Sequence, residues 1–165
     1  MNFFLNLFKL KTKKNEPTHD LIYRHSIKEI ESFENKCWKL SDKGKYELLI
    51  LIICLVFRYH QYINKQIFAG YFYGFLLDVR NDYKVNLSKS DTIKLIESRM
   101  DIYEVMFNEV KEPGSIDGLI YNILYENSLS MNPTPSSQSD IFKVVSCNMA
   151  YSQMHNNVRN QKSLI

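Results

Sequence analysis

Apolar residues recur at spacings of three and four along most of this chain, which is the period of one face of an α-helix. The pattern predicts four amphipathic helices, and no stretch alternates for long enough to predict a strand. The recurring positions are Tyr23, Ile27, Ile30, Phe33, Cys37 and Leu40; Ile93, Ile96, Met100, Tyr103, Phe107 and Val110; Ile116, Leu119, Ile120, Ile123 and Leu124; and Ile141, Val145 and Met149.

The region 45–66 follows a different pattern. It holds ten consecutive apolar residues, Leu48 to Phe57. Because a membrane-spanning helix needs about 20 apolar residues, this run predicts a helix buried at the centre of the fold. A single helix over 45–82 would be ~57 Å long, so we expect a break near 65–70.

Short polar stretches separate the predicted helices. Residues 41–44 (SDKG) predict a turn that also caps the central apolar helix. Ser90 is a candidate cap for the helix that contains Ile93 and Met100, and Pro113 with Gly114 ends that helix. The sequence predicts an all-α, single-domain bundle of five to six helices around the central apolar helix. We expect an amphipathic basic segment over 1–15, the helical domain over 16–158 and a polar tail over 159–165.

Composition supports one folded domain. The chain has 165 residues, of which 45% are hydrophobic and 13% aromatic, and this excludes bulk disorder. Three cysteines are too few for a disulfide scaffold, so we expect free, buried thiols in a reducing compartment. No convincing secretory signal opens the chain, and the expected location is cytoplasmic.

The net charge of +3 is distributed unevenly. Residues 1–14 hold four lysines and no acid, and 141–165 hold three bases and no acid. The stretch between them therefore carries a net negative charge, which makes nucleic acid an unlikely partner for the folded body.

Part of that negative charge forms a stripe on the predicted helix that contains Ile96 and Met100. Its members are Glu97, Asp101 and Glu104, extended by Glu109 and Glu112. The spacing places the first three on one helix face. Such a stripe is either a solvated surface or a docking face for a basic protein partner.

The N-terminal segment combines bulky apolar residues with lysines. Phe3, Phe4, Leu7 and Phe8 fall on one side of a helical wheel, and the other side carries Lys9 and Lys13. This pattern is typical of a helix that lies on a membrane surface. Docking onto a partner, docking onto the protein's own core, or disorder would also account for it.

No catalytic motif is present, and the four histidines fall in separate segments, so the sequence predicts no metal site and no cofactor. Arg99 falls on the apolar side of its predicted helix. A buried guanidinium needs a partner, and we expect a structural ion pair with Glu47 or Asp78.

Three functions follow as alternatives. The first is a non-catalytic cytoplasmic protein-binding module whose acidic stripe binds a basic partner; a small bacterial inhibitor, such as an immunity protein that neutralises a toxin, fits the size and the absence of motifs. The second is a peripheral membrane protein held by residues 1–14. The third is an enzyme or small-ligand binder with an aromatic pocket near Tyr59, Tyr62, Phe72 and Arg99.

Overall fold

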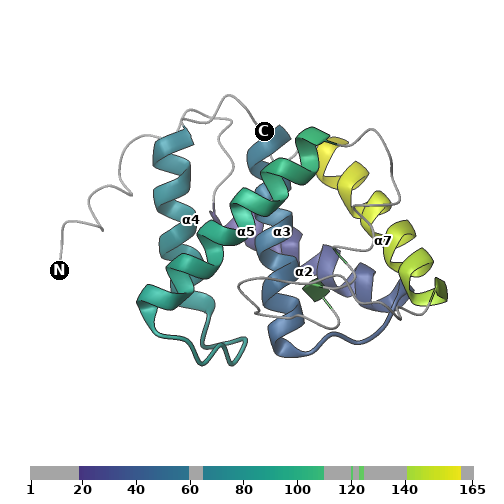
Figure 1. Ribbon diagram of the computed structural model, residues 1–165, viewed down its shortest axis with the longest axis horizontal. Helices are drawn as coiled ribbons and strands as arrows, with labels where there is room; N and C mark the ends of the chain where they lie inside the picture. The colour runs from purple at the N-terminus through teal and green to yellow at the C-terminus, as the bar shows by residue number, and fades with distance from the viewer. Residues whose placement is uncertain (1–18, 60–64, 110–119, 121–122, 125–140, 161–165) are drawn as a thin grey trace.

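The computed structural model describes residues 19–59, 65–109, 120, 123–124 and 141–160. Within these ranges the chain forms five α-helices and no strand (Figure 1). The helices are α2 (His19–Lys36), α3 (Asp42–Tyr59), α4 (Lys65–Val79), α5 (Lys89–Glu109) and α7 (Ile141–Asn160). The predicted all-α fold is confirmed.

Helix α3 is the centre of the bundle. It packs against α2, α4, α5 and α7, and Figure 1 shows α4 on one side of it, α7 on the other and α5 crossing it diagonally between the two. The side chains from Leu48 to Ile52 have no solvent exposure. This part of the apolar run is thus covered by protein on every side, as its all-round apolar character requires, whereas Cys54 and Phe57 further along the run are partly exposed. Among the described helices, none is both long and apolar enough to cross a bilayer.

Serine caps begin two of these helices. The Ser41 hydroxyl accepts the backbone N–H of Gly44 at 3.0 Å, as the turn over 41–44 predicted. The prediction for α5 was wrong, because its cap is Ser88 and not Ser90. Ser88 accepts the N–H of Asp91 at 3.0 Å and donates its hydroxyl to the Asp91 carboxylate at 2.7 Å. An acid at the third helical position makes this reciprocal pairing possible, and Ser90 has Ile93 at that place.

Helix ends also differ from the expected ones. Helix α2 ends at Lys36, although the apolar spacing continues to Leu40, which is buried in the connection to α3. Helix α3 ends at Tyr59 and α4 runs from Lys65 to Val79, so no break falls within 65–70, where one was expected; residues 60–64 lie outside the described part of the chain. Helix α7 continues to Asn160, into the predicted polar tail, since Val158 is fully buried.

The helix predicted after Pro113 lies mostly outside the described residues. Its apolar positions Ile120, Ile123 and Leu124 are described, and all three are buried in the core. The backbone carbonyl of Leu124 would lie 3.2 Å from a Cβ placed on Gly44. A glycine at position 44 therefore allows the start of α3 and this segment to approach closely.

Candidate protein-docking surface

The acidic stripe lies on the solvent-facing side of α5. Glu97, Asp101 and Glu104 are all exposed, whereas Leu95 and Tyr103 on the opposite side are buried. Within the part of the chain that the structure describes, none of the three carboxylates forms an ion pair or a side-chain hydrogen bond. The stripe is therefore a row of uncompensated negative charge.

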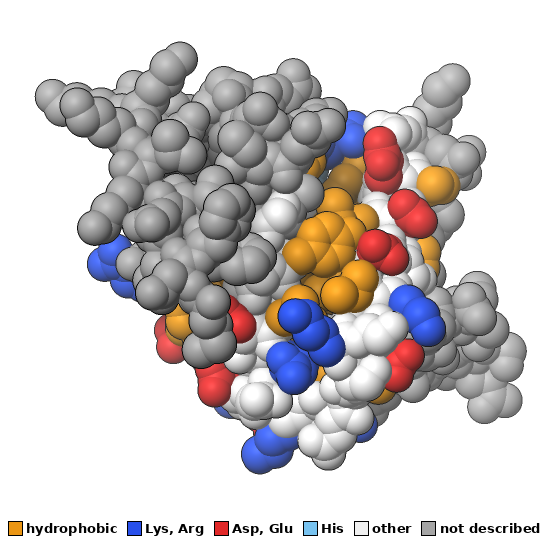
Figure 2. Space-filling view, turned by 90° about the vertical axis from the view of Figure 1, so that its left-hand side faces the viewer, with side chains coloured by type: hydrophobic (Ala, Val, Ile, Leu, Met, Phe, Trp, Pro, Cys, Tyr) orange, Lys and Arg blue, Asp and Glu red, His pale blue; other side chains and the backbone are white. Residues whose placement is uncertain are grey.

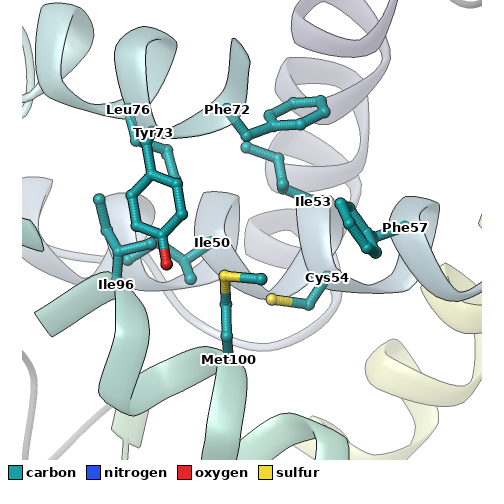
Figure 3. A pocket seen from close by; sticks show the side chains of 9 residues that line it. All are labelled: Ile50, Ile53, Cys54, Phe57, Phe72, Tyr73, Leu76, Ile96 and Met100. Carbon is teal, nitrogen blue, oxygen red and sulfur yellow. The ribbon is translucent and has the colours of Figure 1, made fainter. Parts of the chain in front are cut away.

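An apolar groove runs between α3, α4 and α5 (Figure 3). Side chains one helical turn apart line it from each helix: Ile50, Ile53, Cys54 and Phe57 of α3, Phe72, Tyr73 and Leu76 of α4, and Ile96 and Met100 of α5. The groove contains about 310 Å³ of empty space, including the part that is open to solvent. The centre of a water-sized molecule can reach only about 10 Å³ of this space. Small-ligand pockets usually enclose about 300 Å³ or more, so this groove, whose floor residues Ile50, Leu76 and Ile96 are buried, is a shallow apolar depression and not an enclosed ligand pocket.

The stripe forms one edge of the groove. Glu97 and Asp101 directly follow Ile96 and Met100, so their side chains point ~100° further round the helix, out of the groove and toward solvent. Figure 2, which views the side of the molecule that carries α4 and α5, shows apolar side chains in a hollow with acidic side chains along one edge and Lys or Arg side chains at its upper and lower ends. The apolar floor of the groove and the acidic stripe of α5 are therefore adjacent parts of one surface.

Tyr73 connects the two parts of this surface. Its half-buried ring lines the groove, and its hydroxyl is close enough to Glu97 and Asp101 for their charges to act on it. Burial raises the pKa of the Tyr73 hydroxyl, and the two carboxylates raise it further. At neutral pH the ring thus presents a neutral hydroxyl, which is able to donate a hydrogen bond beside the acidic stripe.

Arg58 stands at the C-terminal end of α5, where the stripe ends. Its guanidinium donates to the Phe107 carbonyl at 2.8 Å and to Asn108 Oδ1 at 3.0 Å, and it lies 5.3 Å from the centre of the Phe107 ring. These contacts hold the charge at the helix C-terminus, where a cation is favourable. Arg58 thus joins α3 to α5 and does not neutralise the stripe.

Arg99 pairs with Glu47 across the core. Arg99 Nε and Nη2 donate to the two carboxylate oxygens of Glu47 at 2.9 and 2.8 Å, and neither side chain has any solvent exposure. Asp78, the other candidate partner, is exposed on α4. Arg99 is fully buried, and its charge is paired with the Glu47 carboxylate inside the core.

The Cys37 and Cys54 thiols are not activated as nucleophiles. Burial raises the pKa of the Cys54 thiol to about 12 and that of Cys37 to about 11, which leaves both protonated at neutral pH. The Tyr59 hydroxyl lies 2.5 Å from Nε2 of His155, and burial, Arg159 and Arg58 lower the pKa of that histidine. Among the described side chains, no group of three or more His, Cys, Asp or Glu is placed to hold a metal ion.

Some of the predicted site residues lie outside the described part of the chain. They are Phe3, Phe4, Leu7, Phe8, Lys9 and Lys13 of the N-terminal segment, Glu112 of the stripe, and Tyr62 of the aromatic region. Glu109 is the last residue of α5, and its side chain is not described.

The third alternative expected an aromatic pocket near Tyr59, Tyr62, Phe72 and Arg99. Of the described members, Phe72 lines the groove, whereas Tyr59 contacts His155 and Arg99 pairs with Glu47. Nothing in the chain indicated that the groove would lie beside the stripe of α5. Comparison of the chain with protein-family models, with curated proteins and with solved structures finds no match.

Proposed function

We propose that this chain is a non-catalytic protein-binding module that docks a basic protein partner on the stripe and groove of α5. The observation that carries the proposal is the row formed by Glu97, Asp101 and Glu104, exposed and uncompensated at the edge of an apolar hollow. Carboxylates in this arrangement would steer a basic surface toward the site, and the groove would hold its apolar side chains.

The chemistry of the surface indicates the kind of partner. Three carboxylates on one helix face favour lysine or arginine, and the groove floor, which contains Phe72, Tyr73 and Met100, favours bulky apolar side chains. A cytoplasmic inhibitor of immunity type, which captures a basic toxin, is one protein that would use such a surface.

A charge-neutralised variant tests this function. In the stripe variant, Glu97→Gln, Asp101→Asn and Glu104→Gln remove three charges from α5. A matched control removes three charges from exposed acids elsewhere, with Glu31→Gln, Asp78→Asn and Asp82→Asn. Each protein is used as bait in a native-cell lysate, and the captured proteins are quantified by mass spectrometry.

The expected result is a basic protein that the wild type and the control both capture and the stripe variant loses. That capture should weaken as the salt concentration rises, because the Debye length falls from about 8 Å at physiological ionic strength to about 3 Å at 1 M. Folding of the stripe variant should be intact, since removing like charges at i,i+4 changes helix stability by only about 0.2–0.5 kcal/mol. Identical capture by the stripe variant and the wild type would refute the proposed function.

A further inference from the structure

We propose that the chain's own N-terminal segment, residues 1–14, occupies the stripe and groove of α5 when no partner is bound. This inference rests on the proposed function, because it assigns a built-in competitor to the same surface. Three features support it: the chemistry of the segment, the chemistry of the surface, and the point at which the segment is attached.

The segment carries the features that the surface requires. Residues 1–14 have four lysines and no acid, and they include Phe3, Phe4, Leu7 and Phe8. The surface offers three uncompensated carboxylates and an apolar groove. One segment of the chain thus carries both lysines and bulky apolar side chains. One face of the fold carries both carboxylates and an apolar hollow, so the two are complementary.

The first turns of α2, which follow this segment in the chain, contact the α4 side of the groove. Tyr23, in the first turns of α2, contacts Phe75 of α4 with 5.3 Å between ring centres, and Phe75 lies 6.4 Å from Phe72 of the groove. From residue 14 to His19, where α2 begins, five residues span up to ~17 Å when extended. A short tether of this kind gives an effective concentration on the order of millimolar, so even a weak contact would be occupied.

Zero-length carbodiimide crosslinking of the purified full-length chain tests the proposal directly. This reagent joins a lysine amine to a carboxylate only where the two are in contact, and peptide mass spectrometry then identifies the joined residues. The Lys84–Asp42 ion pair, with 2.7 Å between Nζ and Oδ2, is an internal positive control. Mixing isotope-labelled with unlabelled chains separates crosslinks within one chain from crosslinks between two.

The expected result is crosslinks within one chain from Lys9, Lys11, Lys13 or Lys14 to residues 97–104. Substituting Phe4→Ser and Phe8→Ser should reduce them several-fold although all the lysines remain, and Asn2→Ser with Asn6→Ser should leave them unchanged. The phenylalanine pair separates docking in the groove from simple charge attraction.

Three results would overturn the proposal. The lysines could crosslink as often to exposed acids elsewhere, such as Glu31 and Asp82; they could crosslink only between chains; or they could crosslink to no residue of the stripe while Lys84–Asp42 forms. None of these results would affect the proposed function, because the purified chain contains no partner. The proposed function would instead be refuted by unchanged capture of the basic partner by the stripe variant.

Discussion

The buried Arg99–Glu47 pair makes a strong prediction about stability. Both side chains are fully buried, and two hydrogen bonds of 2.9 and 2.8 Å join them. Replacing only one partner leaves the other as a buried charge, which typically costs about 3–5 kcal/mol. A domain of this kind is stable by only about 5–15 kcal/mol, so Arg99→Met and Glu47→Met should each remove a large part of that stability.

Urea unfolding followed by far-ultraviolet circular dichroism measures the effect. With an m-value of about 2 kcal/mol/M, each single variant should lower the midpoint by about 2 M. The double variant Glu47→Met/Arg99→Met removes both charges and fills the site with apolar atoms, so it should be close to wild type or more stable. If a single variant fails to fold, recovery of folding in the double variant gives the same information.

A surface ion pair is the matched control. Lys84 contacts Asp42 at 2.7 Å, but the Lys84 side chain is 79% exposed. Lys84→Gln should therefore leave the urea midpoint nearly unchanged, since water already screens this pair. The reasoning is refuted if the two core substitutions simply add, because additivity would mean that Arg99 and Glu47 do not stabilise one another.

Three further predictions follow from single groups. Burial raises the pKa of Glu29, although Asn157 donates to both its carboxylate oxygens at 3.1 Å. The carboxyl of Glu29 therefore favours the folded state below its unfolded pKa and loses this contribution as the pH rises through its raised folded pKa. Glu29→Gln should reduce the fall in urea stability as the pH rises above about 4.5, and an unchanged pH profile would contradict the assignment. Ser41→Ala removes the α3 cap and should cost about 1 kcal/mol, measured by thermal unfolding; no loss would mean that the cap contributes nothing. Cys54 and Cys37, with thiol pKa values of about 12 and about 11, should react with iodoacetamide far more slowly in the folded than in the urea-unfolded chain, and equal rates by mass spectrometry would show that the native thiols are accessible.

Helix α5 shows how much of the fold follows from local sequence. Its apolar residues from Ile96 to Phe107 keep the helical spacing, so both its existence and the common face of Glu97, Asp101 and Glu104 could be predicted from the chain alone. The predicted cap, Ser90, lies two residues after the observed cap, Ser88. Ser88 caps the helix because Asp91, three positions further on, pairs with it.

The groove depends on information that is not local. Helix α4 is apolar around most of its surface, so the sequence does not indicate which side of it faces α5. The same is true of Arg99, for which Glu47 and Asp78 were equal candidates by sequence. The structure selects Glu47 because it lies on the buried side of α3, whereas Asp78 faces solvent.

The central position of α3 also has a consequence during synthesis. The apolar run of α3 leaves the ribosome well before α7, one of the helices that cover it, because α7 ends roughly 100 residues later in the chain. At about 5–20 residues per second, that interval lasts on the order of 5–20 s. During this time the side of α3 that packs against α7 presents an uncovered apolar surface to the cell, so nascent chains of this protein should depend on chaperones more than the small size of the finished domain suggests.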